Sequence, residues 1–218
     1  MTMPGDVPSL VEPVRERFEA RHDAREIGLA ASRDAIRAAA NAIRAVHRGE
    51  DARADALLED AGQHLRTATE ACTPHPDVRY AGFVTDAAKE VAEGVLTRAA
   101  IAGRPLPGPD EVGVDDLAWL HGLAETVGEL RRGCLDRIRR GDLDAAERFL
   151  DVMQEILAGL VTIDVPDGLT KGLRRATDSA RAITERTRGD LTAAVGQREL
   201  RRALDAHREV LERAAGRA

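Results

Sequence analysis

Two groups of acidic side chains have a spacing that places each group on one face of a helix. Glu90 and Glu93 are three residues apart, with Asp86 one turn earlier, and Glu125 and Glu129 are four apart. Like charges at this spacing cost an isolated helix roughly 0.2–0.5 kcal/mol. Hard divalent cations such as Mg²⁺ bind several carboxylate oxygens, and such a centre can activate water and stabilise a phosphoryl transition state. The spacing is therefore compatible with a metal-dependent phosphodiesterase.

The same residues have a simpler interpretation as solvated faces of amphipathic helices. Apolar residues recur at helical spacing opposite Glu90 and Glu93, namely Val84, Ala88, Val91 and Val95. A second apolar face lies opposite Glu125 and Glu129, namely Trp119, Leu120, Leu123, Val127, Leu130, Cys134 and Ile138. Periodicity alone favours solvated faces. A ferritin-like di-iron site needs two Glu-x-x-His motifs, and only Glu19 to His22 fits one.

The elements that must position these residues are helices separated by Gly and Pro. The pattern predicts helices over Ser9–Arg48, 51–72, Pro76 to about Ala102, Asp115 (as cap) to Arg140, 142–163, 169–188 and 191–215. Residues 103–113 form the one clear loop, and Gly189 ends the sixth helix. We expect one all-α domain over residues 1–218, an antiparallel bundle of about seven helices, with flexible ends at about 1–8 and 216–218.

Composition supports a helical protein and excludes several classes. Of 218 residues, 43% are hydrophobic but only 2% aromatic, so Ala and Leu must form most of the core. The net charge of −6 excludes a globally basic nucleic-acid binder, although a local basic surface would suffice. Cys72 and Cys134 form no zinc-finger spacing. The N-terminus lacks an apolar signal core, and no segment is apolar enough to span a bilayer. We therefore expect a soluble cytoplasmic protein without a membrane partner.

A few basic and aromatic residues are candidates for contact with nucleic acid. Arg79 and Tyr80 precede Phe83, and an aromatic ring next to a cation suits single-stranded nucleic acid; Phe83 could equally belong to the core. Arg132 lies three residues after Glu129 and is its nearest cation on the same face. Alternating charges at 174–188 fit either an intrahelical ion-pair ladder or phosphate contacts, namely Arg174, Asp178, Arg181, Glu185 and Arg188.

Several long segments together resemble the translin family, and in particular its prokaryotic members similar to translin-associated factor X. They include DAREIGLAASRDAIRAAANAIRAVHRGE, HPDVRYAGFVTDAAKEVAEGV, WLHGLAETVGELRRGCLDRIRRGDLDAAERFLDVMQEIL and GLRRATDSARAITERTRGDLT. The resemblance covers about residues 20 to 205 and depends on the order and spacing of these segments. It implies a seven-helix bundle that assembles into a hollow homo-octameric barrel and binds single-stranded RNA or DNA on its inner surface.

The resemblance also implies an activity and its residues. Factor X carries a metal-dependent ribonuclease site with a Glu-x-x-Glu pair on one helix and an acid before Gly-Glu-Leu on a later helix. Glu90 and Glu93 match the pair, Glu129 matches the Gly-Glu-Leu glutamate, and Glu125 takes the position of an Asp. The hypothesis is an endoribonuclease in which Glu90, Glu93 and Glu125 bind Mg²⁺ or Mn²⁺, Glu129 assists, and Arg79, Tyr80 and Arg132 contact RNA. A non-catalytic binder of single strands and a purely structural oligomer are the alternatives.

Overall fold

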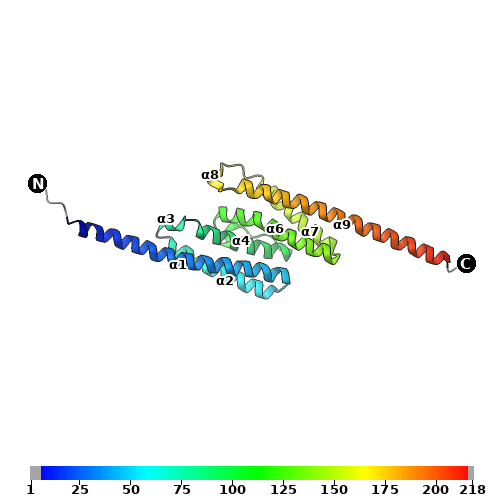
Figure 1. The fold of residues 1–218 in the computed structure, drawn as a ribbon, viewed down its shortest axis with the longest axis horizontal. Helices are drawn as coiled ribbons and strands as arrows, with labels where there is room; N and C mark the ends of the chain where they lie inside the picture. The colour runs from blue at the N-terminus through cyan, green and yellow to red at the C-terminus, as the bar shows by residue number, and fades with distance from the viewer. Residues whose placement is uncertain (1–5, 216–218) are drawn as a thin grey trace. The chain divides into compact units, whose positions relative to one another are not determined.

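The computed structural model describes residues 6–215, and all regular structure in this range is helical (Figure 1). The all-α prediction is therefore confirmed. The chain divides into two compact units, residues 1–123 and 124–218, and each is described below by itself. The single-domain prediction stays a prediction. Of the flexible ends, residues 1–5 and 216–218 lie outside the described range, while Val7 already begins the first helix. None of the described helices is both long enough and apolar enough to cross a membrane.

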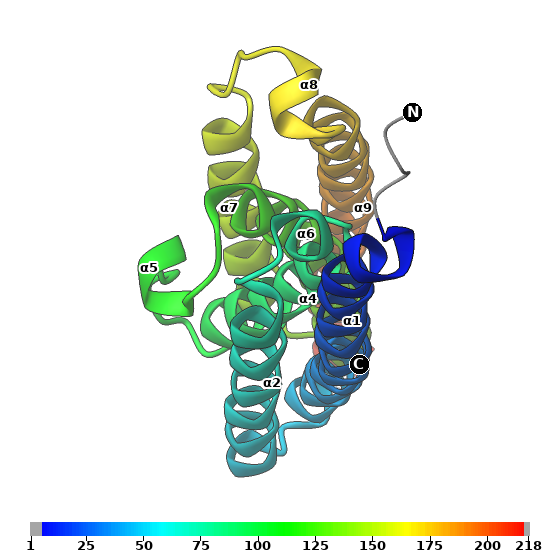
Figure 2. The same cartoon turned by 90° about the vertical axis from the view of Figure 1, so that its left-hand side faces the viewer.

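The first unit begins with two long antiparallel helices, α1 (Val7–Arg48) and α2 (Asp51–Cys72), which lie side by side (Figures 1 and 2). The inner face of α1 consists mostly of alanines, and Ala35, Ala39 and Ala42 are fully buried. Such small side chains let α2 approach closely, which explains how a chain with few aromatics builds a core. Gly49 ends α1 in the left-handed region, at φ +73°, as its sequence position predicted.

The predicted helix from Pro76 to Ala102 is interrupted. The structure has a short α3 (Pro76–Arg79) and a separate α4 (Phe83–Ile101). The break falls at Gly82, whose φ of +106° is open to glycine and strained for other residues. After this break, α4 packs against α1 and α2. Near its C-terminal end, Arg98 donates to both carboxylate oxygens of Asp55 on α2 at 2.8 and 3.1 Å.

The segment after α4 leads into the helix that carries the second acidic group. The predicted loop at 103–113 contains a short helix, α5 (Pro109–Val112). Asp115 accepts a hydrogen bond from the Ala118 amide at 2.9 Å, so the predicted cap of α6 (Asp116–Arg140) is confirmed. The indole of Trp119 donates to the carbonyl of Pro107 at 3.0 Å and ties the loop to α6.

The second unit contains α6 from residue 124 onward, α7 (Leu143–Leu160), α8 (Asp167–Thr170) and α9 (Leu173–Ala215). Figure 2 shows α7 and α9 side by side, with α8 at the turn that joins them. The buried residues of α9 recur every three or four positions, namely Leu173, Thr177, Ala180, Thr184, Thr187 and Leu191. This face packs against the apolar face of α7.

Gly189 does not end a helix, so the predicted division into helices at 169–188 and 191–215 is wrong. The helix α9 continues through Gly189 because residues on both sides of this glycine make contacts with other helices. Thr187 accepts a hydrogen bond from Arg131 at 3.0 Å, Leu191 is 4% exposed, and Arg198 lies 3.6 Å from Asp144 of α7. Glycine inside a helix costs only about 1 kcal/mol, which these contacts offset.

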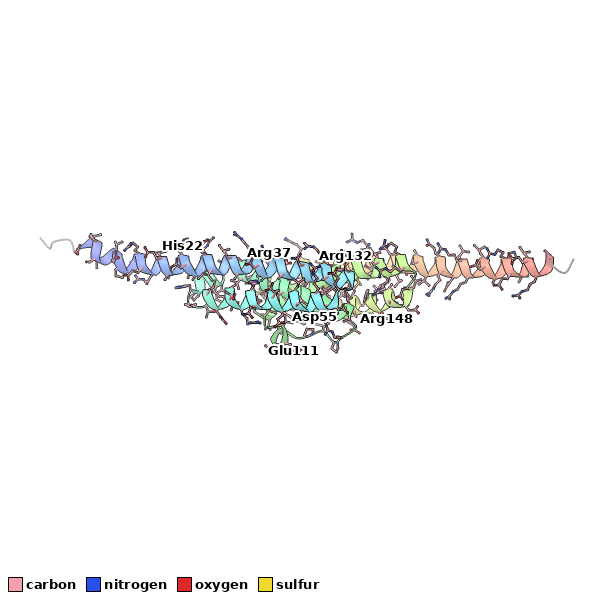
Figure 3. The ribbon with its side chains drawn as sticks, turned by 90° about the horizontal axis from the view of Figure 1, so that it is seen from below. His22, Arg37, Asp55, Glu111, Arg132 and Arg148 are labelled. Carbon is pink, nitrogen blue, oxygen red and sulfur yellow. The ribbon has the colours of Figure 1, made fainter. Side chains whose placement is uncertain are left out.

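The outer ends of α1 and α9 are helical but contain no buried residue. In α1 this holds for residues 7–23, a segment that includes His22 (Figure 3), and in α9 for residues 199–215. Both segments carry exposed large apolar side chains, namely Val7, Leu10, Val11, Val14 and Phe18 in α1 and Leu200, Leu204, Val210 and Leu211 in α9.

Candidate metal centre

Glu90 and Glu93 lie on α4 among buried neighbours. Val91 is 2% exposed and Ala92 is fully buried. The side chain of Glu90 retains 28% exposure, and Glu93 is also half-buried, whereas Asp86 is exposed. The solvated-face interpretation therefore fits Asp86 fully, whereas Glu90 and Glu93 are only partly exposed.

The start of α6 lies against α4 at the level of this pair, and Gly122 is the point of contact. A methyl group on Gly122 would lie 2.7 Å from the Ala92 Cβ, and 2.9 Å from both the Glu93 amide nitrogen and the Lys89 carbonyl oxygen. Two helices approach this closely only where one has no side chain. Glu125 follows three residues later on α6, which places it on nearly the same face as Gly122.

The structure brings together one carboxylate oxygen from each of Glu90, Glu93 and Glu125, all within 4.8 Å of one another. None of the three side chains is buried. Three carboxylates at this separation repel one another, and a divalent cation can offset this repulsion. These three residues are the predicted ligands. Metal binding at this place, and the identity of the ion, stay predictions.

Lys89 is a cation at this centre that spacing arguments missed. Its Nζ lies 3.3 Å from a carboxylate oxygen of Glu90, and its side chain is 25% exposed. Lys89 is the immediate chain neighbour of Glu90, whereas helical spacing pairs residues three or four apart. It is also one of only two lysines in a chain whose cations are otherwise arginines.

Glu129 is paired with a cation and stands outside the group of three. Arg132 lies 3.7 Å from its carboxylate, so the predicted same-face pair is present. Arg132 is labelled in Figure 3. Its side chain is 55% exposed, and that of Glu129 is 24% exposed. The guanidinium of Arg132 can therefore hold Glu129 while donors remain for a second anion.

The predicted basic and aromatic cluster divides between surface and core. Tyr80 is 72% exposed as a residue, and the guanidinium carbon of Arg79 lies 5.6 Å from the centre of its ring. Phe83 instead packs into the core beside Gly28 of α1. The charges on α9 form the ion-pair ladder at two steps, Arg181 with Asp178 at 3.1 Å and Arg188 with Glu185 at 3.2 Å.

Solved structures of the same fold decide the family. The chain is 33% identical to a chain of the AfC3PO–duplex RNA complex, covers 97% of that chain with 86% of its own length, and superposes with a TM-score of 0.81. A crystal structure of AfC3PO gives 33% identity, 98% coverage of that chain and a TM-score of 0.79. The chain belongs to the translin/TRAX-type C3PO family.

Two further matches are more distant. The crystal structure of apo-NeC3PO shares the fold, with a TM-score of 0.72 at 18% identity and 89% coverage of this chain. An uncharacterised protein of Methanocaldococcus jannaschii, MJ0175, is 27% identical over 180 residues, which are 81% of this chain and 79% of that protein. No family model matches the chain. The family resemblance predicted from sequence segments is thus confirmed.

Proposed function

We propose that this chain is a metal-dependent endoribonuclease that binds RNA, with Glu90, Glu93 and Glu125 as the ligands of Mg²⁺ or Mn²⁺. The observation that supports the proposal most directly is the convergence of these three carboxylates from α4 and α6. The C3PO family and the RNA in the AfC3PO complex support RNA as the substrate class.

The donor set fits a hard cation. All three groups offer carboxylate oxygens, which suit Mg²⁺ and Mn²⁺, and no thiolate or imidazole is among them to favour Zn²⁺ or copper. When bound, such an ion supplies an activated water and neutralises charge on the phosphate. Partial exposure of the three carboxylates leaves room for water and a phosphate oxygen beside them.

The residues of the chain would then have distinct tasks. Glu90, Glu93 and Glu125 bind the ion, and one of the carboxylates of this centre takes a proton from the attacking water. Arg132 orients Glu129 through their ion pair and contacts phosphate with its remaining donors. Exposed Tyr80, with Arg79 beside its ring, offers a stacking surface for an unpaired base.

Strand preference follows from that stacking surface. Bases of a single strand can stack on Tyr80, whereas bases of a duplex are already stacked on one another, so we expect single-stranded RNA to bind more tightly. The AfC3PO complex contains duplex RNA, so both forms belong in the test. Single-stranded DNA is a second ligand of the same chemistry.

The test measures cleavage of a short end-labelled RNA by the full chain. We expect cleavage with Mg²⁺ or Mn²⁺, none with EDTA, and a loss of roughly 100-fold or more in Glu90→Gln, Glu93→Gln and Glu125→Gln. Binding of the same RNA in EDTA should stay equal or become slightly tighter, because each change removes a negative charge near phosphate. Duplex RNA and single-stranded DNA serve as competitors.

Asp86→Asn is the matched control. Asp86 is an exposed carboxylate on the same helix, one turn from Glu90 and outside the group of three, so this variant should cut RNA at the parent rate. Equal cleavage by the three glutamine variants and the parent would eliminate the metal centre. RNA binding without cleavage under any of these conditions would instead support the non-catalytic binder.

A further inference from the structure

Gly122 lies on α6 directly against the backbone of α4, at the level of the acidic pair. The three atoms nearest to its missing side chain are the Ala92 Cβ, the Glu93 amide nitrogen and the Lys89 carbonyl oxygen, at 2.7, 2.9 and 2.9 Å. Two of these are backbone atoms of α4, and the third is a Cβ fixed to that backbone. None can rotate away, so a side chain at this position would force the helices apart.

We infer that Gly122 is a positioning residue for the metal centre: the absence of a side chain sets the depth at which α6 lies on α4, and so the separation of Glu125 from Glu90 and Glu93. This inference depends on the proposed function. The backbone atoms of α4 that a methyl group on Gly122 would meet belong to Glu93 and Lys89. Glu93 is a proposed ligand, and Lys89 is the chain neighbour of the ligand Glu90. Glu125 lies one turn further along α6.

The size of the displacement determines what a methyl group would do. Ordinary contacts to a Cβ begin near 3.4 Å, so relief of a 2.7 Å contact needs a shift of several tenths of an ångström. Ligand distances in a metal site tolerate about 0.2 Å. Mg²⁺ demands near-ideal octahedral geometry at about 2.0–2.1 Å, whereas Ca²⁺ accepts flexible geometry at about 2.3–2.6 Å. A widened centre should therefore lose Mg²⁺ before Ca²⁺.

The experiment compares the full chain with Gly122→Ala by calorimetric titration of Mg²⁺ and of Ca²⁺. We expect the Kd for Mg²⁺ to rise about tenfold or more, and the Kd for Ca²⁺ to rise by less than about threefold. General destabilisation of the fold would weaken the binding of both ions alike. The ratio of the Kd for Mg²⁺ to the Kd for Ca²⁺ therefore reports on positioning. Circular dichroism and RNA binding in EDTA check that the variant is folded.

Gly128→Ala is the matched control. Gly128 lies on the same helix, and a methyl group there would meet no atom within 4 Å. This variant should keep the parent affinity for both ions. An equal loss of Mg²⁺ affinity in Gly128→Ala and Gly122→Ala would overturn the inference, because the contact with α4 would not be the cause.

A second variant addresses the possibility that Gly122→Ala does not fold. The double variant Ala92→Gly/Gly122→Ala moves the methyl group from α4 to α6 and should recover part of the Mg²⁺ affinity. If neither variant folds, Gly122 serves the whole fold and the inference is overturned. If both fold and the Mg²⁺ to Ca²⁺ ratio is unchanged, only the inference fails. If the parent binds neither ion, the proposed function fails and the inference with it.

Discussion

Cys134 is a residue whose burial has a consequence that can be measured in solution. Its Sγ donates to the Ala146 carbonyl at 3.5 Å, and the side chain is fully buried on α6. Burial is the main cause that raises the pKa of this thiol from 9.0 to about 11, while nearby Arg131 lowers it and Asp190 raises it. The folded chain therefore favours the protonated thiol over a pH range in which the unfolded chain ionises.

Stability should fall between about pH 9 and pH 11 because of this thiol. Below about pH 9 the thiol is protonated in both the folded and the unfolded state, and its contribution to stability is fully present. Above that pH the unfolded state loses the proton first, so the free energy of unfolding falls by up to about 1.4 kcal/mol per pH unit. Urea unfolding of the parent and of Cys134→Ala from pH 8 to pH 10.5 measures the difference in slope. Cys72, whose pKa burial also raises, is present in both and cancels. Parallel slopes would contradict the prediction.

The sequence was enough to predict which residues belong to the candidate centre, but not the contacts that these residues make. Helical spacing identified both acidic groups, Glu90 with Glu93 and Glu125 with Glu129. The family resemblance then selected Glu90, Glu93 and Glu125 as the ligands, because both arguments depend only on sequence. The ion pair between Lys89 and Glu90 and the packing of Gly122 onto α4 depend on side-chain direction and on the approach of another helix. No spacing rule within one helix contains that information.

At the scale of the helices, glycine was the least reliable guide. Gly49 ended a helix as predicted, Gly82 broke a predicted helix, and Gly189 was predicted to end a helix that continues. The residue type is the same in all three, and the outcome is set by what flanks it. The α9 face that packs on α7 extends to Leu191, beyond Gly189, whereas Gly82 precedes the first turn of α4.

Substitution of two of these glycines by alanine should have opposite effects. Gly189→Ala should raise the free energy of unfolding by about 1 kcal/mol, because the helix is regular there and the new methyl group meets no atom within 4 Å. Gly82→Ala should lower it by roughly 1–3 kcal/mol, because φ at this position is +106°. Urea unfolding measures both. A loss of stability in Gly189→Ala would show that α9 is not one continuous helix.

At the scale of the whole molecule, the outer ends of α1 and α9 are unusual for a monomer. Residues 7–23 and 199–215 have no buried residue, yet they carry large apolar side chains at high exposure, such as Leu10 at 66% and Leu200 at 60%. Exposed apolar surface of this kind usually marks contact with another molecule. We expect other copies of the chain to cover at least part of this surface, as the family resemblance implies.

We therefore expect a homo-octamer. Small Ala and Gly residues on the helices allow close packing between copies as they do within one chain, and the apolar ends of α1 and α9 favour association. Native mass spectrometry and multi-angle light scattering at micromolar concentration should give eight copies. A monomer under these conditions would eliminate the barrel assembly. A smaller closed oligomer would support self-association of the chain, but the predicted number of eight copies would then be wrong.

The hydrogen bond between Trp119 and the Pro107 carbonyl makes the chain its own optical reporter. Trp119 is the only tryptophan in the sequence, so intrinsic fluorescence excited at its absorption edge comes from one known place. That place is the first turn of α6, joined by the bond to the segment that precedes α5. Emission wavelength and quenching therefore report the surroundings of this one indole, without a dye and without background from other indoles. Changes at the start of α6 can thus be followed in real time in the unmodified chain.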